Sequence, residues 1–247
     1  MNIIFQKKTK HNDIIIVEKD NNRILRFKCS DKDNSNLDQS GISLSEPYFH
    51  VFDYTFLSMY SFIFVNNPSK ILIIGLGGGV MPKEISRYFP KVEIDIIEID
   101  EEMPQIASKY FNFNPSQYTK IHIGDAYNVI QSLDTKYDII IVDAFDNNYI
   151  PKNIQKMVFI KNIHFSLKDN GVVAWNTFPL DNTYKDHINN IFGIFEYIYL
   201  LRGIRNNFSY MFFTLKNNII PLVDSMLFSY PKFKPIRIEN KLYNTNN

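Results

Sequence analysis

Apolar residues follow two alternating patterns over most of the 247-residue chain. Short, nearly continuous aliphatic runs are typical of buried parallel strands, and they alternate with segments whose apolar residues have helical spacing. These patterns predict strands at residues 71–75, 92–98, 120–123, 137–143 and 171–177, and helices at residues 81–89, 101–110, 126–132 and 152–167. Because strands that alternate with helices form a parallel sheet covered on both faces, the sequence predicts an α/β fold.

The N-terminal part of the chain has a different pattern. It predicts a β-hairpin with strands at residues 13–18 and 23–28, a polar loop at residues 30–38 and a helix at residues 47–65. The hairpin is indicated by the turn sequence Lys-Asp-Asn-Asn between the two strand-like segments. We therefore predict two domains, a small β-hairpin domain at residues 1–46 and a larger domain at residues 47–247.

The C-terminal part also departs from the alternation. It predicts a helix at residues 183–193, strands at residues 197–201 and 208–215, a short helix at residues 219–229 and a basic tail. The two strands are too close together for a helical crossover, so we expect them to be antiparallel. This ending is typical of adenosylmethionine-binding folds rather than of dinucleotide-binding folds. The expected large domain is Rossmann-like, with a seven-stranded, mostly parallel sheet and an antiparallel C-terminal strand.

A glycine-rich loop follows the first strand of the larger domain. Glycines at the carboxyl end of a buried strand let the backbone turn tightly and approach a ligand, and Gly75, Gly77 and Gly79 have such positions. Glu98 ends the next strand, where a carboxylate can accept hydrogen bonds from ribose hydroxyls. Val80 replaces the third glycine of the dinucleotide fingerprint, which favours an adenosyl ligand without a pyrophosphate. The alternative is a simple turn followed by a surface acid.

Three more acids follow strands of the same predicted sheet. Ligands of open α/β sheets bind outside the carboxyl ends of the strands, so we expect Asp125, Asp143 and Asp146 to face one crevice. Asp125 suits an adenine amino group, or alternatively it caps the helix that follows. Asp143 ends a fully apolar strand, where burial perturbs the affinity of a carboxylate for a proton; alternatively it anchors a loop.

Composition narrows the classes of function. The net charge of +1 gives no general affinity for polyanions, so we expect no nucleic-acid partner. The single cysteine cannot form an internal disulfide, and the five histidines lack the short spacings of metal sites, so we expect no metal. No apolar run is long enough to span a membrane, and the N-terminus lacks a signal-peptide core. Together these observations favour a cytoplasmic protein.

Several motifs occur in a specific order along the chain. They are Ile74-Gly75-Leu76-Gly77-Gly78-Gly79, Ile97-Glu98-Ile99-Asp100, Gly124-Asp125-Ala126 and, at residues 137–146, Tyr-Asp-Ile-Ile-Ile-Val-Asp-Ala-Phe-Asp. Gln39-Ser40 and Tyr48 precede them. In this order, over residues 13–215, the chain resembles the polyamine aminopropyltransferases, which form the spermidine synthase family.

The resemblance implies a reaction and a set of site residues. It implies decarboxylated S-adenosylmethionine as the co-substrate and a small amine as the second substrate. It implies that the nucleoside is bound by Gln39, Gly75, Gly77, Gly79, Glu98, Asp125 and Ala126. It further implies that Asp143 orients and deprotonates the attacking amine, with Tyr48 and Asp146 as amine-binding residues. A small N-terminal β domain and a homodimer are also implied.

Two departures from the family pattern concern the amine site. Gly78 stands where members commonly have an aspartate that helps to bind the amine, and Asn147 stands where they usually have proline. Three functions therefore stay open: aminopropyl transfer to an amine such as putrescine, methyl transfer from S-adenosylmethionine, and nucleoside binding without catalysis. Against methyl transfer, Ile73 has the position at which many methyltransferases have an acid.

Overall fold

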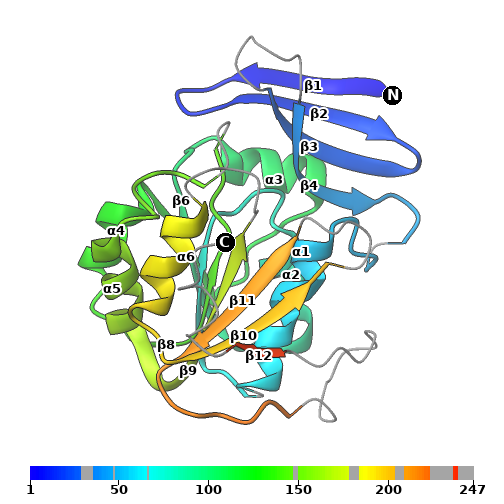
Figure 1. The fold of residues 1–247 in the computed structure, drawn as a ribbon. Coiled ribbons are helices and arrows are strands. Elements are labelled where there is room, and N and C mark those ends of the chain that lie inside the picture. Colours follow the sequence, from blue (N-terminus) through cyan, green and yellow to red (C-terminus); the bar gives the residue numbers. More distant parts are fainter. Residues whose placement is uncertain are drawn as a thin grey trace.

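A computed structural model describes residues 1–28, 36–46, 48–65, 67–146, 150–177, 184–203, 209–222 and 236–238 of the chain. These residues form a four-stranded antiparallel sheet at the N-terminal end and an eight-stranded sheet with helices on both faces (Figure 1). This architecture confirms the predicted Rossmann-like α/β fold with a small N-terminal β-sheet.

The large sheet has a parallel core. Its strands are β5 (Lys70–Ile74), β6 (Glu93–Glu98), β7 (Thr119–Ile123), β8 (Tyr137–Val142), β9 (Leu167–Thr177), β10 (Tyr197–Arg202), β11 (Tyr210–Leu215) and β12 (Ile236–Ile238), in the order β12-β10-β11-β9-β8-β5-β6-β7. From β9 to β7 the strands are parallel, whereas β11 is antiparallel to both β9 and β10, as predicted. The edge strand β12 was not predicted, because three residues are too few to show a period.

Helices cover both faces of this sheet (Figure 1). One face carries α1 (Asp53–Ser58), a 3₁₀-helix (Met59–Ile63), α2 (Val80–Tyr88) and α3 (Met103–Phe111); the other carries α4 (Ala126–Ser132), α5 (Met157–Ser166) and α6 (Tyr184–Phe192). Alternate strand residues supply the two cores. Ile141 of β8 lies in the cluster with α1 to α3, and Val142 lies in the cluster with α4 to α6. None of the described helices has the length and apolar character needed to cross a membrane.

The N-terminal sheet consists of β1 (Asn2–Lys8), β2 (Asp13–Lys19), β3 (Asn22–Lys28) and β4 (Asn36–Ser43). The pairing of β2 with β3 confirms the predicted hairpin. Sequence reasoning missed β1, whose residues are largely exposed and whose register shifts between Ile3 and Phe5. Ile14, Ile16 and Leu25 join the same hydrophobic cluster as α1 to α3. Because the two parts share this core, the division at residue 46 stays a prediction.

Four predicted segments differ from the structure. The predicted helix at residues 47–65 was wrong at its start, because His50 pairs with Ile42 in an extended bridge and helix α1 begins only at Asp53. The predicted loop at residues 30–38 was wrong for residues 36–38, which belong to β4; residues 30–35 lie outside the described part.

The other two segments are at helix boundaries. Helix α5 begins at Met157 rather than at residue 152, because residues 152–155 form turns; residues 150–155 line the cavity described below. Residues 219–222 are not helical, and the Leu222 N–H donates a hydrogen bond to the Ile63 carbonyl. The rest of the predicted helix at 219–229 lies outside the described residues.

Candidate active site

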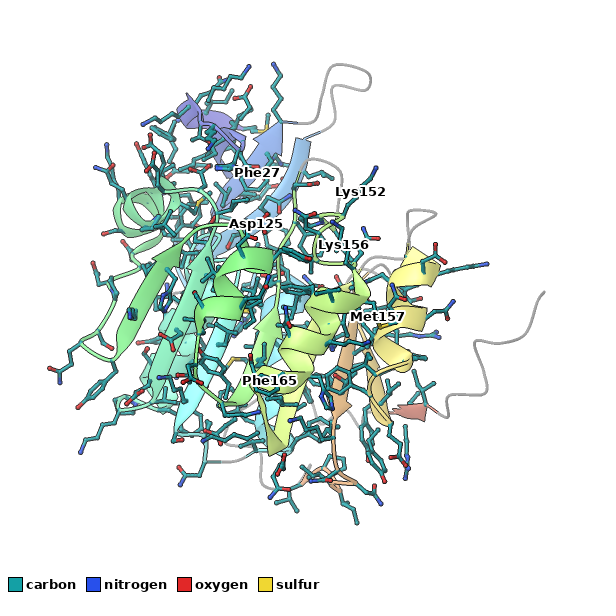
Figure 2. All side chains as sticks on the ribbon, turned by 90° about the vertical axis from the view of Figure 1, so that its left-hand side faces the viewer. Phe27, Asp125, Lys152, Lys156, Met157 and Phe165 are labelled. Atoms are coloured by element: carbon teal, nitrogen blue, oxygen red, sulfur yellow. The ribbon has the colours of Figure 1, made fainter. Side chains whose placement is uncertain are left out.

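A cavity of about 840 Å³ lies at the carboxyl ends of the parallel strands, beneath the N-terminal sheet. Its volume is within the range of about 300–1,000 Å³ typical of small-molecule sites. The large sheet contributes the glycine loop and the acids that follow its strands, and the N-terminal sheet contributes Phe27, Asp38 and Gln39. Figure 2 shows Phe27 above Asp125, so the two sheets form opposite walls of the cavity.

The glycine loop approaches β8 closely. Gly75 has a φ of +98°, and a Cβ atom there would overlap the main-chain carbonyl of Asp143. Gly77 has a φ of +52° and also lines the cavity. Gly79 has a φ of +70° and precedes α2, but a Cβ there would overlap the ring of Phe113 instead. Gly75 and Gly77 therefore shape the cavity wall, whereas Gly79 lies outside it and lets the loop pack on the segment after α3.

Glu98 connects the tip of β6 to the glycine loop. Its Oε2 accepts a hydrogen bond of 2.9 Å from the Leu76 N–H, and its Oε1 accepts one of 2.9 Å from the Asp100 N–H. Burial raises the pKa of Glu98, and the backbone donors oppose this rise. Each carboxylate oxygen can accept a second hydrogen bond. Glu98 can thus hold the loop and bind hydroxyl groups of a ligand at the same time.

The structure places Asp125 both at the start of helix α4 and at the wall of the cavity. Its Oδ1 accepts a hydrogen bond of 2.9 Å from the Tyr127 N–H, which caps helix α4. Its Oδ2 accepts one of 3.1 Å from the Asn153 side chain, in the segment between β8 and α5. Asp125, Ala126 and Asn153 all line the cavity. The capping role is observed, and the carboxylate also faces the space where a ligand would lie.

Asp143 follows β8 and lies beside Asn176 at the end of β9. The Asn176 Nδ2 donates a hydrogen bond of 2.8 Å to the Asp143 Oδ1, and both residues line the cavity. Burial raises the pKa of Asp143 to about 7, and the bond from Asn176 acts in the opposite direction. A carboxyl group with this pKa exchanges protons near neutral pH, which suits a general base.

Tyr54 of α1 completes this wall of the cavity. Its hydroxyl donates a hydrogen bond of 2.8 Å to the Gln39 carbonyl. Burial and the nearby charge of Asp143 raise the pKa of the Tyr54 hydroxyl, so it stays protonated. Tyr54 lies within the helix predicted at residues 47–65, and no local signal distinguishes a tyrosine at a cavity from one in a core. Asn176 was also missed, although it lies one residue before the end of a predicted strand, close to where the predicted acids lie on theirs.

Tyr48 lies elsewhere. Its side chain is exposed, and the guanidinium of Arg87 lies 3.7 Å from the centre of its ring. It is not among the residues that line the cavity, whereas Gln39 and Asp146 are. The amine-binding role implied for Tyr48 stays a prediction, and its placement does not supply a contact for it.

The charge of the cavity wall is negative. Besides Tyr54, its described ionisable residues are the acids Asp38, Glu98, Asp125, Asp143 and Asp146, the base Lys152, and His11. Asp38 is paired with Arg26. Lys152 is exposed and lies in the segment before α5, next to Lys156 (Figure 2). The cavity therefore favours cationic ligands. No group of three or more potential metal ligands occurs among the described residues.

Gly78 has a closed environment. A Cβ atom at this position would lie 2.9 Å from the Ser40 hydroxyl and 3.0–3.1 Å from the Phe111 ring. Both neighbours are buried. The space in which an aspartate at this position would begin is therefore filled by side chains of β4 and α3.

Comparisons with known proteins identify relatives of two kinds. The model of the family described as "Spermine/spermidine synthase domain" matches residues 55–190, more than half of the chain. A polyamine aminopropyltransferase of Vibrio vulnificus is 34% identical over 200 residues, covering 78% of this chain and 66% of that protein. An eEF1A lysine and N-terminal methyltransferase of Mus musculus is 31% identical over 136 residues, covering 51% of this chain and 20% of that protein.

A solved structure shows the same fold. The crystal structure of spermidine synthase from Thermotoga maritima has a TM-score of 0.71 and 20% sequence identity, covering 90% of this chain and 75% of that chain. Against the curated relatives, this chain spans slightly less than two thirds of the length of the Vibrio protein and a fifth of the length of the mouse protein.

Proposed function

Because the chain belongs to the spermine/spermidine synthase family, we propose that it transfers the aminopropyl group of decarboxylated S-adenosylmethionine to a small amine. The observation that carries this proposal is Asp143 at the wall of an acidic cavity, with a pKa raised to about 7 by burial. Such a carboxylate can take a proton from an amine near neutral pH. The name of the Vibrio relative supports the choice of the transferred group.

In this proposal the adenosyl part of the donor lies across the strand ends. Glu98 accepts hydrogen bonds from the ribose, and Asp125 accepts one from the adenine amino group. Gly75 and Gly77 let the backbone approach the ligand, because they have no side chain in the way. Both residues have a positive φ, which residues with a side chain rarely adopt. Gln39, at the opposite wall, contacts the nucleoside from the N-terminal sheet.

The proposed step forms one C–N bond and breaks one C–S bond. The lone pair of the amine attacks the methylene carbon next to the sulfonium, and the C–S electron pair leaves with methylthioadenosine, a neutral thioether. The attacking nitrogen gives its extra proton to Asp143. Asp146 binds the cationic part of the amine. Holding both reactants in one cavity contributes to the rate by proximity.

The charge of the cavity supports this choice of substrates. Decarboxylated S-adenosylmethionine carries a sulfonium and an ammonium, and the acceptor carries at least one more amino group that can be protonated. Among the described ionisable residues of the cavity wall, carboxylates outnumber the exposed Lys152. The excess of carboxylates at this wall stabilises several cationic groups in one cavity.

One observation favours a second function, which is methyl transfer from S-adenosylmethionine. The space beside Gly78 is filled by Ser40 and Phe111. Among the described residues, no carboxylate therefore takes the place of the aspartate that family members commonly have at this position. Relatives named as eEF1A methyltransferases match half of the chain at similar identity. In this alternative Asp143 would serve the same role as a base toward an amine.

A product assay distinguishes the two transfers. The purified protein is incubated with decarboxylated S-adenosylmethionine and a panel of amines that includes putrescine, and separately with S-adenosylmethionine and the same panel. The proposal expects methylthioadenosine in the first series. Formation of S-adenosylhomocysteine alone would instead favour methyl transfer. Binding of methylthioadenosine without any product would favour nucleoside binding without catalysis.

The variant Asp143→Asn tests the base. It should lower turnover by about a hundredfold or more, which is the usual contribution of a general base, and change the affinity for methylthioadenosine by less than about threefold. Asp169→Asn is the matched control, because the Asp169 side chain is 89% exposed and lies outside the cavity. Full activity of Asp143→Asn would show that another group accepts the proton.

A further inference from the structure

Asn176 and Asp143 are brought together by the register of two parallel strands. Val142 of β8 lies opposite Trp175 of β9, so Asp143 and Asn176 continue the same ladder by one residue. The Asn176 Nδ2 donates a hydrogen bond of 2.8 Å to the Asp143 Oδ1. The Asn176 side chain lines the cavity and is only 6% exposed. Its amide therefore has a fixed position next to the proposed base.

The side-chain oxygen of Asn176 gives a second observation. Among the described residues, the Asn176 Oδ1 is buried and has no hydrogen-bond partner. A buried acceptor without a donor destabilises a fold, and such exceptions call for an explanation. An ionised carboxylate can only accept hydrogen bonds, so Asp143 requires the nitrogen of the amide on its side. The orientation that satisfies Asp143 leaves the Asn176 oxygen unsatisfied.

We propose that Asn176 is a positioning residue for group transfer, which favours the ionised form of the Asp143 carboxylate and presents its Oδ2 to the acceptor amine. The hydrogen bond from Nδ2 occupies Oδ1 and fixes the rotation of the carboxylate. Oδ2 is then the oxygen that accepts the proton of the attacking nitrogen. This inference rests on the proposed role of Asp143 as the base.

Other ionisable groups also face this cavity, so their effects must be separated from that of Asn176. Tyr54 of α1 lies near Asp143 but stays protonated. The remaining described groups of the wall are His11, Asp38, Glu98, Asp125, Asp146 and Lys152. Asn176 is the described residue whose side chain donates a hydrogen bond to Asp143. A change confined to Asn176 should therefore act on Asp143 directly.

The first test measures the pKa of Asp143 by carbon-13 NMR of its carboxyl group, in the protein without ligand. Asn176→Leu keeps the approximate size but removes the donor, and should raise the pKa by about one pH unit. Asn176→Asp adds a second carboxylate and should raise it further. The acid limb of kcat/KM against pH should move in the same order. An unchanged or lowered pKa in Asn176→Leu would overturn the proposal.

A control and a second measurement exclude a merely structural role. Thr214→Val removes a buried acceptor that binds the Trp175 indole N–H at 2.9 Å on the neighbouring strand, away from Asp143. It should lower the melting temperature without moving the pKa of Asp143. If the Asn176 variants do not fold, an NMR titration of the wild-type protein tests the proposal instead. Its Asn176 side-chain amide signals should titrate with the midpoint of Asp143, and signals independent of pH would refute the proposal.

Failure of this inference and failure of the proposed function are distinguishable. The NMR titrations need no substrate, so they give a result even if neither donor is turned over. Absence of any transfer product would refute the proposed function. Transfer with an acid limb that is the same in the wild-type protein and in Asn176→Leu would refute the role of Asn176 alone.

Discussion

The carboxylate of Glu98 accepts a hydrogen bond of 2.9 Å from the backbone N–H of Leu76, which joins the tip of β6 to the glycine loop after β5. The second carboxylate oxygen binds the Asp100 N–H, so two backbone donors converge on one side chain. The residue proposed to bind ribose therefore also sets the conformation of the loop. Its replacement should affect ligand binding and loop geometry together.

For Glu98→Gln we expect the affinity for methylthioadenosine to fall by about tenfold or more. A glutamine amide has one oxygen, so one of the two backbone donors would face an NH₂ group and lose its acceptor. Isothermal titration calorimetry measures the affinity. Glu93→Gln at the start of the same strand is the control, because Glu93 lies far from the cavity and pairs with Lys70. Equal affinity of Glu98→Gln and wild type would exclude the ribose role.

The pKa of Asp143 predicts a pH-dependent stability. Burial raises it from 3.8 to about 7, so between these values the folded protein holds a proton that the unfolded chain has lost. The stability from this group is fully present below about pH 4 and is lost as the pH rises through about 7. Asp143→Asn removes the titration. Its melting temperature relative to wild type should therefore be higher at about pH 8 than at about pH 5.

This comparison needs both proteins in the same series of buffers. Asp169→Asn should show a constant difference from wild type over the same range, since its side chain is 89% exposed. A constant difference for Asp143→Asn as well would mean that the carboxyl group of Asp143 has an ordinary pKa in the folded protein.

The closed environment of Gly78 predicts a steric cost. Gly78→Ala should lower the free energy of unfolding by about 1–3 kcal/mol, the usual effect of overpacking, because its Cβ would meet Ser40 and Phe111. Urea denaturation measures this change. In a Phe111→Leu background the same substitution should cost less. Gly193→Ala, where the nearest atom would be 3.3 Å away, is the control with more space. Equal costs in the two backgrounds would show that Phe111 is not the obstacle.

The placements of the two tyrosines predict different effects on activity. Tyr54→Phe removes a hydroxyl that binds the Gln39 carbonyl at the cavity wall, and should lower kcat/KM by about tenfold. Tyr48→Phe should change it by less than about twofold, because Tyr48 is exposed and lies against Arg87. Steady-state kinetics with one amine measures both. The reverse order would place the amine near Tyr48 instead.

Local sequence was sufficient where each element has a continuous pattern. The aliphatic runs of the parallel strands identified five strands and the helices between them, because both faces of such strands are buried. The same rule located Glu98, Asp125 and Asp143, since parallel strands end together at one edge of a sheet. It would also have located Asn176, had polar amides been considered beside acids.

What the sequence alone determined is thus the α/β class, the hairpin of β2 and β3, the glycine loop and the acids at the strand ends, because backbone geometry and the period of apolar residues specify them locally. The tertiary structure decided the rest. Strand β1 depends on pairing with β2, and helix α1 starts late because of the bridge between His50 and Ile42. The contacts of Tyr54 and Gly78 join segments far apart in the chain, so only packing could fix them.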